Sequence, residues 1–117
     1  MLPDDRDPAC VLDMVLAARQ AVAFLGERSV DAVERDALVL SAIAHQLIVA
    51  GEAARRVSDG FRQLHPEIPW SQSIGMRNVL VHDYGAVLAG EVVNTVRRDL
   101  PGLIEALLRL LPAGAAD

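Results

Sequence analysis

The sequence contains no lysine, a single cysteine, Cys10, and an aromatic content of only 3%. One cysteine excludes an internal disulfide and a thiolate metal cluster. So few aromatic residues argue against a β-sandwich, because a core of Ala, Leu and Val suits packed helices better. All 11 basic residues are arginines, and with 16 acidic residues they leave a net charge of -5. That balance argues against a generic basic surface for nucleic acid.

Signals for secretion or membrane insertion are also missing. The first residues, MLPDDRDPA, are acidic where a secretory signal would be basic and then apolar. The longest uncharged stretch, residues 37–51, is shorter than the roughly 18 residues needed to cross a bilayer. We therefore expect no membrane span and a cytoplasmic location. The three histidines are scattered along the chain, so we expect neither a metal site nor a cofactor.

The residues that are present predict one all-α domain over positions 1–117. The chain is 52% hydrophobic, which is enough apolar material for a single core. Apolar spacing, caps and breakers predict helices or helical turns at 8–25, 30–35, 36–57, 61–64, 71–82 and 90–111, with Ser71 capping the fifth. Pro101 either kinks the last of these or starts a new segment with Asp99 as its cap. Four of these are long. We expect them to form an antiparallel bundle with short helical turns between them.

The helix over 36–57 has an unusual distribution of apolar residues. Leu40, Ile43 and Leu47 begin one buried stripe, but Leu38 and Ile48 make the first half apolar nearly all round. Such a helix must be covered on more than one side, by other helices or by a partner chain. One interpretation is that residues 37–51 serve only as an assembly surface.

Polar residues gather in Arg77-Asn78-Val79-Leu80-Val81-His82-Asp83-Tyr84. At about 100° per residue, Asn78 and His82 lie within about 40° of one another on the predicted helix, whereas Arg77 lies about 140° from His82. One chain therefore supplies half a site, and a second copy related by a twofold axis would bring two Arg, two Asn and two His to one cleft. The apolar residues between them are expected to bury the helix.

These residue types suit RNA cleavage without a metal. A histidine, with a reference pKa near 6.5, can take the proton from a ribose 2′-hydroxyl at neutral pH. Arginine offers a planar fork to phosphate oxygens and stabilises the extra charge of the transition state. A second histidine from the dimer mate would protonate the leaving 5′ oxygen. Asn78 would orient the phosphate or the imidazole.

The sequence resembles the HEPN superfamily, and within it the HepT-like ribonuclease toxins of toxin-antitoxin modules. The resemblance lies in Arg77, His82 and Tyr84 within GMRNVLVHDY, and in the flanking segments IVAGEAARRVS, HPEIPW and DLPGL at 48–58, 65–70 and 99–103. It implies an all-α homodimer and a metal-independent endoribonuclease with Arg77 and His82 as catalytic residues. It also implies an antitoxin partner, a minimal nucleotidyltransferase of the MntA type, which silences the toxin by transferring AMP from ATP to Tyr84.

Several residues admit two interpretations. Glu52 either positions Arg77 or His82, with Asn78 and Asp83 as further supporting residues, or forms an intrahelical ion pair with an arginine of GEAARR. Three nearby arginines either widen an RNA track or form a solvated face: Arg55, Arg56 and Arg62. We expect His45, within its apolar run, to be a buried or interface histidine.

The motif itself also has plainer explanations. His82 could complement a helix dipole, Arg77 could form a surface ion pair, and Tyr84 could be a packed ring. The main functional alternative is a non-catalytic helical module that binds the nucleotidyltransferase and nucleotide, with the same residues gripping phosphate.

Overall fold

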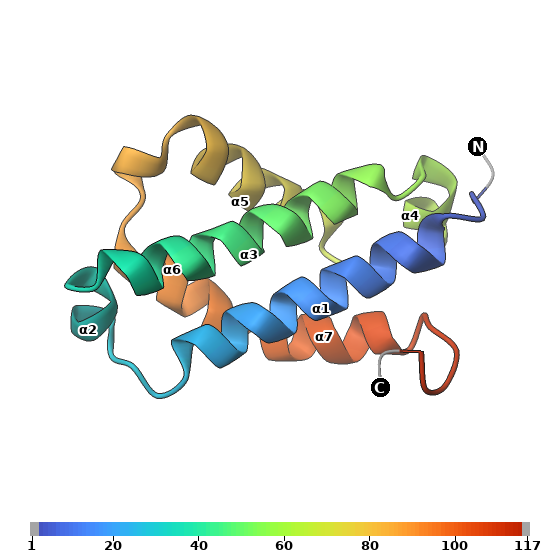
Figure 1. Ribbon diagram of the computed structural model, residues 1–117. Helices are drawn as coiled ribbons and strands as arrows, with labels where there is room; N and C mark the ends of the chain where they lie inside the picture. Colours follow the sequence, from blue (N-terminus) through green and yellow to red (C-terminus); the bar gives the residue numbers. More distant parts are fainter. Residues whose placement is uncertain (1–2, 116–117) are drawn as a thin grey trace.

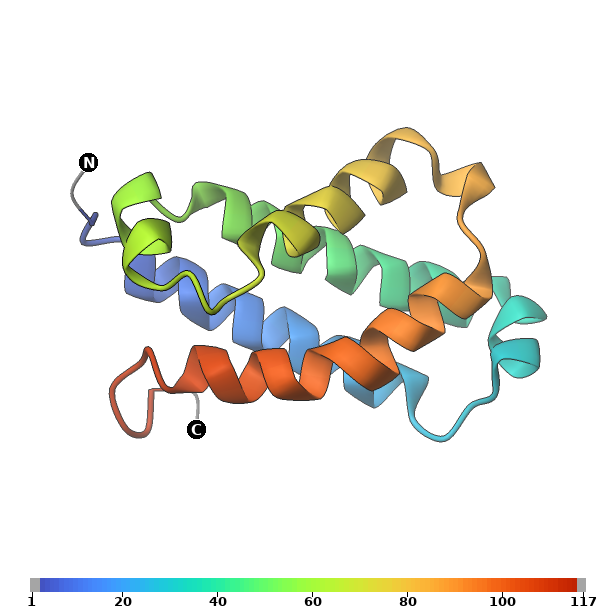
Figure 2. The same ribbon diagram turned by 180° about the vertical axis from the view of Figure 1, so that it is seen from behind.

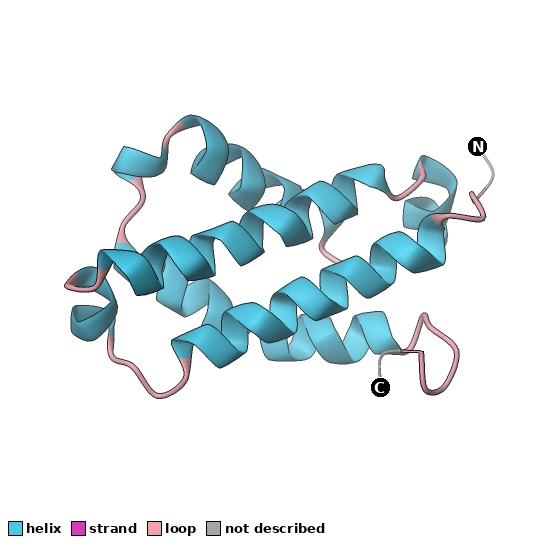
Figure 3. Cartoon of the chain, viewed as in Figure 1, coloured by secondary structure: helices cyan, strands magenta, loops and turns pink. Residues whose placement is uncertain are grey.

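The computed structural model describes residues 3–115, and within that range every regular element is a helix (Figure 3). The predicted all-α class is therefore confirmed. The elements, in chain order, are α1 (Asp7–Leu25), α2 (Val30–Glu34), α3 (Ala37–Arg56), α4 (Asp59–Leu64), α5 (Trp70–His82), the 3-10 turn η1 (Tyr84–Ala86), α6 (Ala89–Asn94), the π-helical segment η2 (Thr95–Asp99) and α7 (Leu100–Leu108).

The first three helices begin and end within one residue of the predicted bounds. Pro8 occupies the first turn of α1, and Gly26 ends that helix with a φ of 53°, a conformation that glycine adopts without strain. Ser29 caps α2 by accepting a hydrogen bond from the backbone N–H of Ala32. Asp36 caps α3 in the same way through the N–H of Val39. Local cap chemistry therefore fixes these boundaries.

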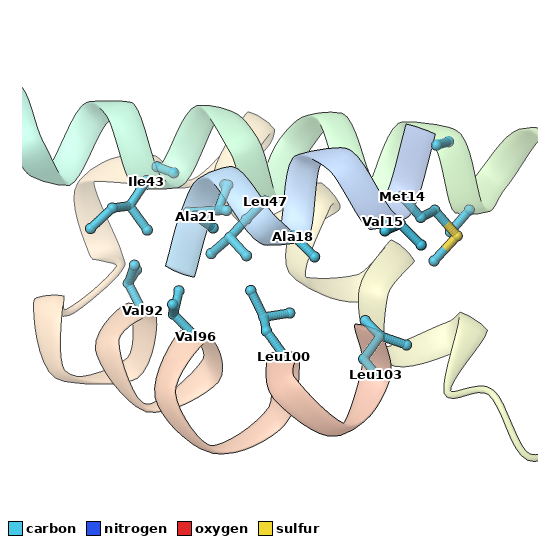
Figure 4. Packing of buried hydrophobic residues seen from close by; sticks show 14 of the residues in the cluster. Met14, Val15, Ala18, Ala21, Ile43, Leu47, Val92, Val96, Leu100 and Leu103 are labelled. Carbon is cyan, nitrogen blue, oxygen red and sulfur yellow. The ribbon is translucent and has the colours of Figure 1, made fainter. Parts of the chain in front are cut away.

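The core lies between α1, α3 and the C-terminal helices. In both ribbon views α1 runs beside α3, α5 lies along one edge of the bundle and α7 along the other (Figures 1 and 2). Both α1 and α3 carry buried alanines, whose small side chains allow neighbouring helices to pack closely. Figure 4 shows side chains from all three regions meeting in one cluster, among them Met14, Ala18, Ile43, Leu47, Val92, Val96, Leu100 and Leu103.

By length and apolar composition alone, α1 and α3 each meet the threshold for a membrane-spanning helix. Both are central helices of this bundle, and their apolar residues supply much of the core cluster. Core helices of soluble proteins meet the same threshold, so this finding is weak evidence for a span. The absence of a span remains a prediction.

The C-terminal helices decide between the two alternatives at Pro101. Asp99 does not cap a new helix: its backbone is already helical, and its side chain makes no capping hydrogen bond. Instead α6, η2 and α7 follow one another without a break. Pro101 lacks the N–H that would continue the helical ladder, and the π-helical segment ends two residues before it, at Asp99. The chain therefore passes the proline within one helical run.

Two helix starts differ from the prediction. Ser58 caps α4, which begins at Asp59 rather than at Phe61, because the hydroxyl of Ser58 accepts a hydrogen bond from the N–H of Phe61. The helix therefore includes Asp59 and Gly60. Likewise α5 begins at Trp70 and not after Ser71, because the carbonyl of Pro69 already accepts the first helical hydrogen bonds.

A buried carboxylate joins the start of α1 to the start of α4. Asp7 is only 1% exposed, and its oxygens accept hydrogen bonds from the backbone N–H of Ser58 at 2.8 Å, the hydroxyl of Ser58 at 2.7 Å and the N–H of Asp4 at 2.7 Å. Burial raises the pKa of Asp7, but these donors outweigh it and hold the pKa below its usual value. The folded state therefore favours the ionised form.

This linkage predicts a loss of stability in acid. The pKa of Asp7 is lower in the folded state than in the unfolded state. Its contribution to the free energy of unfolding is therefore fully present above the unfolded-state pKa of about 4, and it disappears as the pH falls through the folded-state pKa. Asp7→Asn should lower the free energy of unfolding at pH 7 by about 1–3 kcal/mol. Urea denaturation between pH 3 and pH 7 measures both effects. Asp5→Asn, the same change at an exposed position, is the control and should lower the free energy of unfolding only slightly. Equal losses of stability in the two variants would contradict the stabilising role assigned to Asp7.

Candidate active site

Helix α5, which carries the predicted motif, approaches α3 very closely at Gly51. A Cβ atom at Gly51 would lie 2.2 Å from the Cβ of Arg77 and 2.7 Å from the carbonyl oxygen of Ser73. No side chain fits in that space, so the two helices are nearly in backbone contact here. This contact fixes the position of Arg77 over α3.

Arg77 is held from two sides. Its Nε atom forms an ion pair with Oε1 of Glu52 on α3, and both of these atoms are buried. Its Nη1 atom donates a hydrogen bond of 2.8 Å to the side-chain oxygen of Asn78. The side chain is 16% exposed. The remaining guanidinium N–H groups have no partner in residues 3–115 and are available to an anion.

His82 lies on a different side of the same helix. It is the last residue of α5 and is exposed, as is Asn78 one turn earlier, whereas Arg77 faces α3. This agrees with the wide angle that the helical spacing predicts between Arg77 and His82. The structure therefore places Arg77 and His82 on two different sides of α5 rather than in one compact group.

The apolar residues of the motif correct another expectation. Only Leu80 is buried, while Val79 and Val81 are both exposed. Helix α5 has α3 as its main neighbour, and one neighbour can cover only one side of a helix. Two other strongly exposed apolar side chains are Leu38, at 80%, and Leu88, at 66%.

Asp83 and Tyr84 follow the helix. The backbone N–H of Asp83 donates to the carbonyl of Val79 at 2.8 Å and closes the last turn of α5. Tyr84 begins η1, and its side chain is 42% exposed. The tyrosine is therefore not a packed core ring in the single chain.

The structure also distinguishes between the alternatives for the surrounding residues. Glu52 pairs across helices with Arg77, so it is positioned to orient that arginine, while Arg56 pairs with Asp13 of α1 at 3.8 Å. His45 is exposed, so the expectation that it is buried within the chain is wrong, because it lies on the outward face of α3. A place for His45 at an interface between chains remains a prediction.

Sequence reasoning missed Gly51, which decides how closely α5 approaches. The signal that would have indicated it is the run of small residues at 50–54, interrupted only by Glu52, which marks a surface where another helix can come close. Among the described residues, no three His, Cys, Asp or Glu side chains gather as a metal site would require.

With this geometry established, similarity to other proteins decides the family. A family model for ribonuclease HepT-like proteins matches residues 14–110. The chain belongs to this family. The resemblance found from the motif and its flanking segments is thereby confirmed, and the match includes the whole of α3 and α5, which carry the site.

Curated relatives of this HepT-like chain are named as ribonucleases. A Thermococcus cleftensis protein named "Probable ribonuclease HepT" is 39% identical over 62 residues, which cover 53% of this chain and 56% of that protein. A Methanocaldococcus jannaschii protein named "Putative RNase MJ1380" is 26% identical over 93 residues, covering 80% and 85%. No solved structure matches the chain. These names support a ribonuclease role.

Proposed function

We propose that this HepT-like chain is a metal-independent endoribonuclease with Arg77 and His82 as its catalytic residues. The observation that carries the proposal is an arginine held by Glu52 with free N–H groups, on the same short helix as an exposed histidine. An arginine positioned in this way stabilises a phosphate that gains charge, and an exposed imidazole is free to exchange a proton.

In the proposed reaction, the imidazole of His82 takes the proton of a ribose 2′-hydroxyl. The 2′ oxygen forms a bond to phosphorus, and the bond from phosphorus to the 5′ oxygen breaks. An imidazolium of the second copy gives its proton to the leaving oxygen, so the products are a 2′,3′-cyclic phosphate and a 5′-hydroxyl. The guanidinium of Arg77 binds the phosphate oxygens throughout.

A homodimer is part of this proposal, because one chain offers only half a site. The separation of Arg77 from His82 around α5 supports it, as do the exposed apolar side chains of Val79, Val81 and Leu38. Apolar side chains that no helix of the same chain covers favour a contact with another molecule. A twofold axis beside α5 would cover them and bring both copies of the motif together.

Regulation by a nucleotidyltransferase antitoxin also belongs to the proposal. The exposed Tyr84 lies two residues after His82 and is accessible to a modifying enzyme. Its phenolic oxygen would attack the α-phosphorus of ATP, lose its proton to solvent and release pyrophosphate. The added AMP would bring bulk and negative charge next to the imidazole and keep RNA away.

The decisive test is cleavage of RNA by the purified chain in the presence of a chelator. We expect fragments with 2′,3′-cyclic phosphate ends, identified by mass spectrometry, and growth arrest when the chain is expressed without its partner. If the intact chain at stoichiometric excess leaves RNA uncut and cells unharmed, the proposal fails and the non-catalytic binding module becomes the better explanation.

A further inference from the structure

Three arginines near the site have different surroundings. Nη2 of Arg56 lies 3.8 Å from the carboxylate of Asp13 on α1, and Nη2 of Arg62 lies 3.1 Å from that of Asp59. Arg55 is exposed, and within residues 3–115 neither an acidic side chain nor a carbonyl pairs with it. Only this arginine of the three keeps its full hydrogen-bonding capacity.

Arg55 also lies on the side of α3 that faces the site. It follows Gly51, the point of contact with α5, by one helical turn, so the two residues are about 40° apart around the axis and about 6 Å apart along it. Arg56 is about 140° from Gly51, which agrees with its pairing on the α1 side. Arg55 is three residues from Glu52 and therefore neighbours it on the helix surface.

The charges around the site make an unpaired arginine at position 55 important for binding RNA. Glu52 neutralises Arg77 before any substrate arrives, and the whole chain carries a net charge of -5, which repels a polyanion. Two other arginines without a partner among the described residues, Arg98 and Arg109, belong to η2 and the end of α7. Those elements face α5 across a small cavity that Gln72, Ser73 and Met76 of α5 line and that Arg77 does not reach. Within residues 3–115, Arg55 is thus the arginine beside the site for which no partner is found.

We propose that Arg55 is a substrate-positioning residue that binds the phosphate next to the scissile one in an RNA strand, an inference that rests on the proposed ribonuclease function. A guanidinium grips a phosphate through its planar fork and does so regardless of the base. The site then prefers strands with more than one phosphate. It gains affinity by releasing counterions, so this contact weakens as salt rises.

The test compares Arg55→Gln with Arg56→Gln, two changes of equal charge at adjacent exposed positions. The substrates are a dinucleoside monophosphate, whose only phosphate is the scissile one, and a pentanucleotide. Arg55→Gln should lower kcat/KM on the pentanucleotide by about threefold to tenfold, mainly through KM, and reduce the slope of log KM against log salt by about 0.7. It should leave the dinucleotide unchanged, and Arg56→Gln should leave both substrates unchanged.

Each contrary result has a defined meaning. An unchanged pentanucleotide rate in Arg55→Gln, an equal loss on the dinucleotide, or an equal loss in Arg56→Gln overturns the assignment of Arg55. In all three cases the proposed ribonuclease function still stands, because the unmodified chain cleaves RNA. If the unmodified chain cuts neither substrate, the proposed function fails and this inference fails with it. Melting temperatures of both variants should equal that of the unmodified chain.

Discussion

Replacement of His82 by alanine should reduce RNA cleavage by about 10²- to 10⁴-fold, the usual contribution of a group that transfers a proton in the transition state. The fold should not change, because His82 is exposed at the end of α5 and contributes nothing to the core. Initial rates on a fluorescent oligoribonucleotide measure the first effect, and thermal unfolding followed by circular dichroism measures the second.

His82→Gln distinguishes proton transfer from simple contact. Glutamine keeps a polar side chain of similar reach but cannot exchange a proton near neutral pH, so its activity should be as low as that of His82→Ala. The RNA affinity of His82→Gln, measured by anisotropy, should stay close to that of the unmodified chain. If His82→Gln retains most of the activity, the imidazole does not carry the proton and the catalytic role assigned to it is wrong.

The sequence was sufficient to predict helices wherever a local signal decides the boundary. Ser29, Asp36 and Gly26 act through side-chain caps or a positive φ, and these effects need no tertiary contact. Where a local signal competes with packing, the sequence left two alternatives open, as it did at Pro101. Asp99 is a good cap residue, yet the run from α6 to α7 continues past it because burial of Val96 and Leu100 on one face keeps the chain helical.

The site could be predicted only in part for a similar reason. The angle between Arg77 and His82 follows from helix geometry within one element, and the structure agrees with it. The ion-pair partner of Glu52 depends on which helix packs on α3 and on where along α3 it does so. Helical spacing alone favoured Arg55 and Arg56 equally as that partner. The exposure of Val79 and Val81 likewise depends on the number of neighbours around α5, which residue types alone do not reveal.

Gly51→Ala should have the second large effect on activity and stability, because the site depends on the close contact between α5 and α3 at Gly51. The new Cβ would meet the Cβ of Arg77 at 2.2 Å and the carbonyl oxygen of Ser73 at 2.7 Å, closer than such atoms can approach. Neither atom can rotate away, since both are fixed to the backbone of α5, and the whole helix must shift. Overpacking of this kind costs about 1–3 kcal/mol, which exceeds the gain of up to about 1 kcal/mol in helix propensity.

Activity should fall more than stability suggests, because α5 carries both Arg77 and His82. A displacement of about 1 Å at a reacting group can cost about 10²-fold in rate. Gly102→Ala is the matched control: this glycine is also helical, and a Cβ there meets no atom within 4 Å, so the variant should gain up to about 1 kcal/mol and keep its activity. Urea denaturation and initial cleavage rates, taken where both variants are folded, give the comparison. If Gly51→Ala matched Gly102→Ala in both measurements, close packing of α5 on α3 would not be what holds Arg77 in place.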